Sequence, residues 1–491
     1  MTVAETMAGQ IRGVAAGGTR TFLGVPYAEP PLGSLRFRAP VPRRPWAGVR
    51  DAMSFGPRAV QTPMNPAVPP QDPGDEDCLY INVWAPDRPG THPVLFWVHG
   101  GAFVTGSGND ADGQALAEAG LVVVTVNYRI GPFGYLYLGD IAPGVADTNV
   151  ALRDLALALD WTTANIESFG GDANRIILAG ESSGAMMVGA MLGAPSCKGK
   201  YSAAWLMSGA ARQVRTREMA TRSAEMFLEA AGISPEDVAT VRDLPTSALA
   251  SASAVLARYS QHDQQFDAEV MLPVVGDDVL PDHPMEAVRR GSSRDARILV
   301  SWTLKDMGLF RIFDGDNGGR NKELFGRRLI GDQRWEELAR TYHAGGDDWY
   351  VDLLTDFHFS IPARRLAEAQ LQSGGRSWVA RFDRAPATPP WEKFGPVHTC
   401  DLFYLWTPLS APERESTDVG AGSGMLAQDR GLSQTVREVV ARLATNEELV
   451  VGTDWPEYDT RSRATLLFDD PVRAVNDPDR LRRSAWDGLL E

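Results

Sequence analysis

Three short apolar runs place the strongest constraint on the fold of this 491-residue chain. They occupy residues 94–98, 121–126 and 176–179, and each is continuous and rich in β-branched or aromatic side chains. Such runs are typical of strands buried on both faces of a parallel sheet. Between the second and third runs, residues 149–166 repeat apolar side chains near helical spacing. The alternation predicts an α/β fold with a doubly wound, mostly parallel central sheet.

The chain is predicted to form one domain over residues 1–491, because no separable linker or internal repeat interrupts it. Further strands are expected at 297–302 and 378–382, where the sheet resumes. The intervening stretch, about 216–290, has helical character and predicts a cap insertion over the carboxyl edge of the sheet. A segment rich in Ser, Gly and Pro at about 410–424 predicts a mobile surface loop.

Charge and composition exclude several classes of function. The formal net charge is −15, so nucleic acid and anionic membrane surfaces would be repelled. Residues 1–18 lack a basic start followed by an apolar stretch, and no run of about 18 apolar residues occurs. Three cysteines without metal-ligand spacing favour a reducing compartment over a disulfide framework. These features predict a cytoplasmic protein without a membrane span.

A single G-x-S-x-G pattern provides a candidate nucleophile. It consists of Gly180, Glu181, Ser182, Ser183 and Gly184. A predicted strand precedes it and a helix of small residues follows, which is the strand, sharp turn and helix that a nucleophile elbow requires. The glycines would leave room for a strained serine backbone. The alternative, a glycine-rich turn with an incidental serine, does not account for this context.

A second glycine-containing loop follows the first predicted strand and reads His99, Gly100, Gly101, Ala102, Phe103. After a strand at this place, a loop whose N–H groups stabilise a developing oxyanion is expected. The expected donors are the N–H groups of Gly101 and Ala102, joined by that of Ser183. Gly100 is expected to support the loop by allowing close approach of the backbone.

With these motifs, the chain resembles the type B carboxylesterase family, the bacterial para-nitrobenzyl esterase branch in particular. The resemblance covers nearly the whole chain and rests on five segments: FLGVPYAEPPLGSLRF at 22–37, EDCLYINVW at 76–84, FGGD at 169–172, GPVH at 395–398 with Asp401 and Tyr404 beyond it, and WPEY at 455–458. It implies the α/β-hydrolase fold, a small-molecule ester substrate and no cofactor.

The resemblance also implies two structural ion pairs, Arg36 with Glu76 and Arg153 with Asp172. In secreted relatives the cysteine equivalent to Cys78 forms a disulfide with an upstream cysteine. No cysteine precedes Cys78 here, so a free thiol is expected.

Among seven histidines, His398 is the candidate base. It follows a late predicted strand and completes the chain order serine, acid, histidine that this fold uses. His92 and His262 lie in polar segments, and His99 belongs to the glycine-containing loop.

The acid is where this sequence departs from its relatives. The family places a glutamate between an aspartate and a glycine, but residues 305–310 read KDMGLF, so Met307 occupies the acid slot. A thioether cannot accept the imidazole N–H as a carboxylate does. Three explanations stay open. Asp306 reaches the histidine, or Glu181 supplies compensating charge, or a serine–histidine dyad suffices with water or a carbonyl orienting the ring.

The sequence therefore predicts a serine carboxylesterase that forms an acyl-enzyme on Ser182 and acts on esters, with carbamates or amides as further substrates. One alternative is a biosynthetic acyl transferase or cyclase, motivated only by the altered acid position. A non-catalytic binding protein is a third hypothesis, which retention of Ser182 and His398 disfavours.

Overall fold

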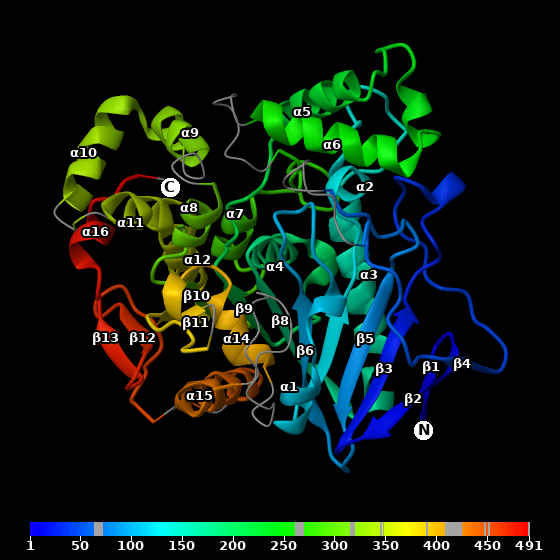
Figure 1. The fold of residues 1–491 in the computed structure, drawn as a ribbon, viewed down its shortest axis with the longest axis horizontal. Coiled ribbons are helices and arrows are strands. Elements are labelled where there is room, and N and C mark those ends of the chain that lie inside the picture. The colour runs from blue at the N-terminus through cyan, green and yellow to red at the C-terminus, as the bar shows by residue number, and fades with distance from the viewer. Residues whose placement is uncertain are drawn as a thin grey trace.

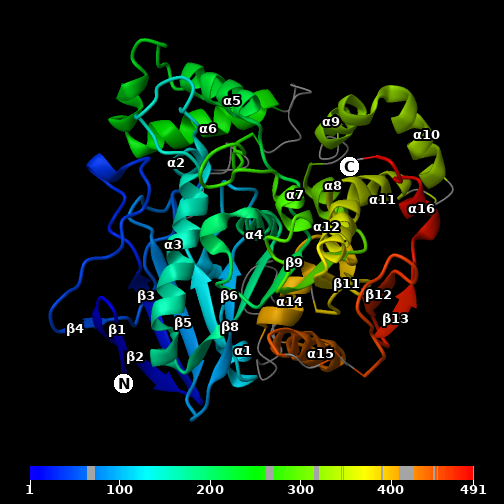
Figure 2. The ribbon, with the colours of Figure 1, turned by 180° about the vertical axis from the view of Figure 1, so that it is seen from behind.

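The computed structural model describes residues 1–62, 72–260, 270–314, 320–343, 346, 348–388, 391–407, 425–445, 448–449 and 452–489. The predicted loop at 410–424 lies outside them. Most of the described chain is arranged around one large twisted sheet with helices on both faces (Figures 1 and 2).

Within the described residues, the sheet has thirteen strands in the order β1-β2-β3-β5-β7-β6-β8-β9-β10-β11-β12-β13, with β4 paired to β2. All pairs from β7 to β12 are parallel, and antiparallel strands flank them on both sides. All five predicted strands are confirmed as β6, β7, β8, β10 and β11. The bounds are β1 Thr2–Thr6, β2 Gly9–Ala16, β3 Thr19–Pro26, β4 Val49–Asp51, β5 Tyr80–Pro86, β6 His92–Val98, β7 Val122–Val126, β8 Gly171–Glu181, β9 Ala203–Met207, β10 Arg297–Thr303, β11 Arg376–Phe382, β12 Ala464–Phe468 and β13 Arg473–Asn476.

Burial on both faces explains why the central strands are continuously apolar. In β6, Val94, Phe96 and Val98 belong to one hydrophobic cluster, while Leu95 and Trp97 belong to another. Because successive strand side chains point to opposite faces, each strand contributes to both cores. The first cluster contains buried residues of α3 and α4, and the second contains those of α15. Burial of the strands on both faces therefore explains both the continuous apolar runs in the sequence and the packing of helices on each side of the sheet.

The predicted helix at 149–166 is confirmed as α3, and the helix after the nucleophile motif as α4. The helix bounds are α1 Gln114–Glu118, α2 Gly131–Tyr135, α3 Val150–Asn165, α4 Ser183–Gly193, α5 Arg217–Ala230, α6 Thr246–Ser260, α7 Pro284–Arg289, α8 Gly308–Asp314, α9 Arg320–Ile330, α10 Asp332–Tyr342, α11 Trp349–Thr355, α12 Ile361–Gln372, α13 Trp391–Phe394, α14 Cys400–Trp406, α15 Ala427–Leu443 and α16 Arg480–Ser484.

Helices are inserted between the central strands at two places. The stretch predicted to be a cap contains α5, α6 and α7 between β9 and β10. A second group, α8 to α11, lies between β10 and β11, where the sequence reading placed no insertion. Figure 1 shows α5 and α6 above the sheet on one side and α9 and α10 on the other. The assignment of 216–290 as a cap within a single domain stays a prediction.

One of the two implied ion pairs is present and the other is wrong. Arg36 forms a two-pronged pair with Glu76, in which Nε lies 2.7 Å from Oε2. Arg153 instead contacts Asp278 at 3.1 Å, and Asp172 pairs with Arg175 at 2.7 Å. Asp172 and Arg175 are only three residues apart. Their pairing therefore costs less conformational entropy than a pairing of Asp172 with Arg153 on α3 would.

The three cysteines Cys78, Cys197 and Cys400 are all buried free thiols, as expected for Cys78. Within the described ranges, no helix is long and apolar enough to cross a membrane.

Candidate active site

Ser182 lies on the sharp turn between β8 and α4. Its backbone has φ 56° and ψ −128°, an unfavourable conformation for a residue with a side chain. A Cβ atom on Gly184 would lie 2.1 Å from the carbonyl oxygen of Val98, and one on Gly180 would lie 2.6 Å from the carbonyl carbon of Gly184. The prediction that only glycine fits on both sides of the serine is confirmed.

His398 is within hydrogen-bond distance of this serine. Its Nε2 lies 2.9 Å from Ser182 Oγ, and its Nδ1 lies 2.7 Å from Oδ1 of Asp306. The imidazole is 4% exposed and packs against the rings of Phe310 and Phe359, with centroids 5.3 and 5.1 Å away. Packing and the two polar contacts therefore fix the ring between the serine and the aspartate.

Asp306, rather than the residue in the usual acid slot, contacts the histidine. Its second oxygen, Oδ2, accepts hydrogen bonds from the backbone N–H of Thr303 at 2.9 Å and the hydroxyl of Ser208 at 3.1 Å. The carboxylate is fully buried, so these donors and the imidazole replace its hydration. Met307 is 2% exposed within a hydrophobic cluster, and its N–H bonds to Thr355. The geometry matches the first of the three explanations for the altered acid position.

Two further carboxyl groups lie close to the imidazole. Glu181 Oε1 is 3.3 Å from His398 Nε2, so the glutamate beside the serine approaches the same ring nitrogen as Ser182 Oγ. Asp401 is fully buried, and one of its oxygens accepts a hydrogen bond from Leu402 N–H. The sequence reading assigned no role to Asp401 or Ser208. Ser208 could have been found from its position in the chain. It directly follows β9, and the carboxyl end of β9 lies at the same edge of the sheet as Ser182.

Burial and mutual charge shift the pKa values of this cluster. Burial raises the pKa of Glu181 to about 8, although the nearby imidazolium opposes the shift. Burial, followed by the charge of Asp306, raises the pKa of Asp401 to about 7. Burial alone would lower the pKa of His398, but the charge of Glu181 and the hydrogen bond that the ring donates to Asp306 together raise it to about 9. The ionisation of Glu181 thus controls how readily the imidazole gives up its proton.

This coupling predicts the pH dependence of a Glu181→Gln variant. A histidine base works only when neutral, so a raised pKa confines activity to higher pH. Removing the Glu181 charge lowers the pKa of His398 and should move the acidic limb of the kcat/KM profile to lower pH, by roughly one unit or more. The measurement is kcat/KM for an aryl ester between pH 5 and 10. An acidic limb that does not move would contradict the coupling.

The glycine-containing loop lies directly against the nucleophile. A Cβ atom on Gly100 would be 3.1 Å from Ser182 Cβ and 2.7 Å from the carbonyl oxygen of Glu181. Gly101, Ala102 and Phe103 all have positive φ, at 118°, 53° and 64°. This unusual run turns the backbone sharply beside the serine, and Gly100 lacks the side chain that would block the approach.

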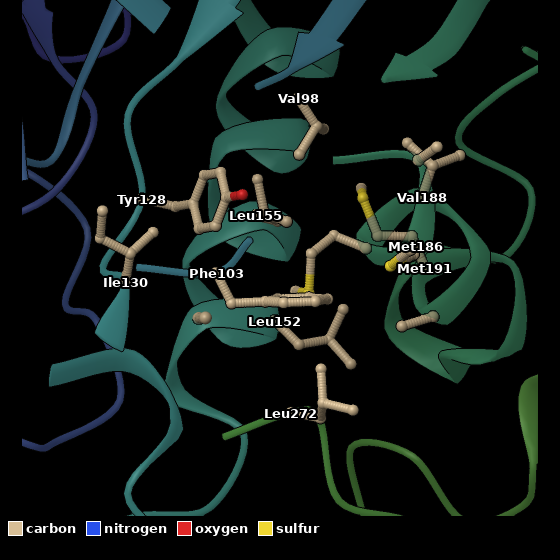
Figure 3. Packing of buried hydrophobic residues seen from close by; sticks show 14 of the residues in the cluster. Val98, Phe103, Tyr128, Ile130, Leu152, Leu155, Met186, Val188, Met191 and Leu272 are labelled. Atoms are coloured by element: carbon tan, nitrogen blue, oxygen red, sulfur yellow. The ribbon is translucent and has the colours of Figure 1, made fainter. Parts of the chain in front are cut away.

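Side chains and main-chain bonds hold the loop in this shape. Phe103 is buried in the cluster shown in Figure 3, together with Leu152 of α3 and Met186 of α4. The Gly131 N–H bonds to the Phe103 carbonyl at 2.6 Å. Burial lowers the pKa of His99 to about 4, so its ring stays neutral, with Nδ1 2.9 Å from the Gly100 carbonyl.

The proposed oxyanion donors have no competing acceptor. Among the described residues, the N–H groups of Gly101, Ala102 and Ser183 donate no hydrogen bond. Ser183 is the first residue of α4, so its N–H has no acceptor within the helix and also lies at the positive end of the helix dipole. These groups are available to an oxygen that develops negative charge beside Ser182.

A parallel sheet wound on both faces, with a serine on a strained strand-to-helix turn, is the α/β-hydrolase architecture. The model of the carboxylesterase family matches residues 1–484, and the chain belongs to that family. It is an enzyme that hydrolyses esters, which overturns the alternative of a non-catalytic binding protein.

Several relatives show the extent of the similarity. The para-nitrobenzyl esterase of Bacillus subtilis (strain 168) is 32% identical over 98% of this chain and 97% of its own length. The phenmedipham hydrolase of Pseudarthrobacter oxydans is 37% identical over 63% of this chain and 62% of its own length. The fumonisin B1 esterase of Sphingopyxis macrogoltabida is 36% identical over 61% of this chain and 55% of its own length.

Solved structures agree with these matches. A para-nitrobenzyl esterase structure aligns with a TM-score of 0.86 and 30% identity, covering 98% of this chain and 99% of the other. A Geobacillus stearothermophilus carboxylesterase aligns with a TM-score of 0.82 and 31% identity, covering 99% of this chain and all of the other.

Proposed function

We propose that the enzyme hydrolyses carboxylic esters through an acyl-enzyme on Ser182, with His398 as base and Asp306 as the triad acid. The observation that carries this proposal is the continuous series of contacts from Ser182 Oγ to His398 Nε2 and from His398 Nδ1 to Asp306. Each member has the chemistry and the geometry that its role requires.

In the first half of the reaction, Ser182 Oγ attacks the ester carbonyl carbon while Nε2 of His398 takes the hydroxyl proton. Asp306 accepts the Nδ1–H bond, which holds the productive tautomer and stabilises the imidazolium. The N–H groups of Gly101, Ala102 and Ser183 stabilise the oxyanion. Collapse of the intermediate breaks the bond to the alcohol oxygen, which takes the proton from Nε2 and leaves an acyl group on the serine.

In the second half, water replaces the alcohol. His398 takes a proton from the water as it attacks the acyl carbon, the same N–H groups stabilise the second oxyanion, and the proton returns to Ser182 Oγ as the acid leaves. No step needs a cofactor. The altered acid position was the only motive for an acyl transferase or cyclase, and an aspartate bonded to the histidine removes that motive.

The substrate class follows from family likeness rather than from the triad, since the same tetrahedral chemistry serves esters, carbamates and amides. A relative that matches nearly the whole chain is named a para-nitrobenzyl esterase, and another is named a phenmedipham hydrolase. Para-nitrobenzyl and para-nitrophenyl esters are therefore the first substrates to test, followed by aryl carbamates and anilides.

The proposal is tested by covalent trapping. A fluorophosphonate should add one label per chain, and peptide mass spectrometry should place that label on Ser182. Para-nitrophenyl acetate should give a burst of nitrophenol equal to the enzyme concentration if deacylation is slow. Heat-denatured protein serves as the control, because only the folded site activates the serine. A label on another residue, or none on the folded protein, would refute the assignment.

A further inference from the structure

The turn that carries Asp306 connects β10 to α8, and hydrogen bonds tie it to two other segments of the chain. The N–H of Lys305 donates to the carbonyl of Pro396, in the loop that carries the histidine, at 2.9 Å. The N–H of Met307 donates to Oγ1 of Thr355 at 3.1 Å. The first acceptor is a main-chain atom, whereas the second is present only because residue 355 has a hydroxyl group. The second bond therefore depends on the identity of one side chain.

This second bond acts on the peptide unit that joins residue 306 to residue 307. A peptide unit is planar, so holding its N–H in one direction constrains the rotations on either side of it, which are ψ of Asp306 and φ of Met307. Those rotations determine how both side chains point. Asp306 is directed to His398, 2.7 Å from Nδ1, and Met307 is directed into the hydrophobic cluster.

Thr355 is placed where water cannot substitute for its hydroxyl. It is the last residue of α11 and is 2% exposed, and Met307 is equally buried. A buried N–H that loses its acceptor is costly to the fold. Without the hydroxyl, the turn would be stabilised by rotating this N–H toward another acceptor, and that rotation would move the Asp306 carboxylate away from the imidazole.

The helical segment that carries Thr355 also supports the histidine. A π-helical turn, Asp356–Ser360, follows α11 directly. Within it, Phe359 packs against the imidazole of His398, with ring centroids 5.1 Å apart and planes inclined at 29°. Thr355 and Phe359 are four residues apart, about one turn, so they lie on the same side of the segment. This rare type of turn, which is frequent at functional sites, therefore accompanies contacts to both the acid turn and the base.

An ion pair fastens the same turn to α11 at a different point. Lys305 Nζ lies 2.7 Å from Asp352 Oδ1, and Asp352 Oδ2 lies 3.0 Å from Nη1 of Arg482. The Lys305 side chain is 28% exposed, so water weakens this attraction. The pair brings the turn to the helix, but it does not contact the peptide unit that follows Asp306.

We infer that Thr355 is a positioning residue of the proposed triad, and that its hydroxyl determines that Asp306, rather than residue 307, faces His398. The inference rests on the proposed role of Asp306 as the acid. It adds the physical reason that this residue contacts the imidazole although the family uses the next position.

The bonds of the Asp306 carboxylate itself are the competing explanation for its direction. Oδ2 accepts hydrogen bonds from the Thr303 N–H and the Ser208 hydroxyl. If these bonds sufficed, the hydroxyl of Thr355 could be removed without loss of turnover. The two explanations therefore differ in the outcome of one substitution.

Thr355→Val removes the acceptor and keeps the shape of the side chain. It should lower kcat for para-nitrophenyl acetate by about 10- to 100-fold, the loss expected when catalytic groups are misplaced by about 1 Å, and change KM by less than about threefold. Thr355→Ser keeps the oxygen and should restore kcat to within about threefold of the original enzyme. An unchanged kcat in Thr355→Val would overturn the inference.

Thr6→Val is the matched control. Thr6 is 6% exposed, and its hydroxyl also accepts a backbone N–H, that of Gly9 at 3.2 Å. It lies on β1, the first strand in the order of the sheet, whereas the nucleophile follows β8. Its replacement should leave kcat unchanged. An equal loss of kcat in both valine variants would show a general effect on the fold and would refute a positioning role.

The double variant Thr355→Val with Asp306→Asn shows whether Thr355 acts through the acid. In the Asp306→Asn background, Thr355→Val should change kcat by less than about threefold, because the carboxylate that it positions is already absent. An equal fold-loss in both backgrounds would overturn the inference. If Asp306→Asn alone leaves kcat unchanged, the proposed triad fails instead, so the two failures are distinguishable.

The pH profile is a readout that a loss of stability does not move. Burial lowers the pKa of His398, while the charge of Glu181, the hydrogen bond to Asp306 and the charges of Asp306 and Asp401 raise it. Moving Asp306 away lowers this pKa, and Glu181 and Asp401 are unchanged by the substitution. The acidic limb of kcat/KM in Thr355→Val should therefore shift to lower pH. A lower kcat with an unshifted limb would contradict the inference.

Thermal melting establishes that each variant is folded. If Thr355→Val does not fold, Thr355→Ala removes the same acceptor without placing a methyl group against the Met307 N–H. Its kcat in the original and Asp306→Asn backgrounds then decides the inference by the same criteria.

Discussion

Replacing Ser182 with alanine is expected to lower turnover of a para-nitrophenyl ester by about 10⁶-fold, to the level that the oxyanion donors and substrate binding support alone. The loss is large because, in the part of the chain that the structure describes, no other hydroxyl contacts His398 Nε2, which lies 2.9 Å from Ser182 Oγ. The fold should not suffer, since alanine has the same Cβ and the glycines that accommodate the turn are unchanged. Steady-state kinetics and thermal melting measure the two effects.

Ser183→Ala is the matched control, because it removes a hydroxyl from the neighbouring position. The Ser183 hydroxyl is buried without a hydrogen-bond partner among the described residues, and the variant keeps the backbone N–H assigned to the oxyanion. It should therefore retain turnover within about tenfold of the original enzyme. Equal activity of Ser182→Ala and the original protein, with unchanged melting temperatures, would disprove the nucleophile assignment.

The sequence was informative wherever one short segment determines the outcome. The apolar runs predicted β6, β7 and β8 because strands buried on both faces must be apolar at every position. The turn at Ser182 was predictable because the steric demand on Gly180 and Gly184 arises within five residues and one adjoining strand. In both cases the physical cause lies in the local sequence.

The sequence was least informative where distant segments must meet. Whether Asp306 or position 307 faces His398 depends on how the turn after β10 sits against the loop that carries the histidine, and 92 residues separate Asp306 from His398. The same difficulty accounts for Arg153, whose partner Asp278 lies on a loop 125 residues away. Ser208 was missed because a serine after a strand has no distinctive pattern until β9 and β10 are paired.

Asp306→Asn is expected to lower kcat by about 10⁴-fold, the second-largest effect anticipated here. An asparagine can turn its amide N–H toward Nδ1 and stabilise the wrong tautomer, and it cannot stabilise the imidazolium. Asp383→Asn provides a control, because Asp383 is another hydrogen-bonded aspartate, with 11% of its side chain exposed, whose contacts with Arg381 lie outside the triad. It should affect the melting temperature more than kcat. A mild effect of Asp306→Asn on kcat would exclude the aspartate as the working acid.

Met307→Glu tests the same assignment from the opposite direction. If the site lacked an acid, a glutamate in the slot that the family uses would raise turnover. In this structure Nδ1 of His398 is already bonded to Asp306, and the Met307 side chain lies in a hydrophobic cluster. We therefore expect no gain in kcat and a loss of stability of roughly 3 kcal/mol from burying an unpaired carboxylate.

The double variant Asp306→Asn with Met307→Glu decides between the two positions. If the backbone of the turn directs only residue 306 toward the histidine, the double variant should be as inactive as Asp306→Asn alone, because a glutamate at 307 points into the apolar cluster. If it instead recovers most of the lost kcat, position 307 can still reach Nδ1. Asp306 would then be a replacement for an acid that position 307 once supplied. The geometry of the turn would not be the reason that residue 306, rather than residue 307, contacts the histidine.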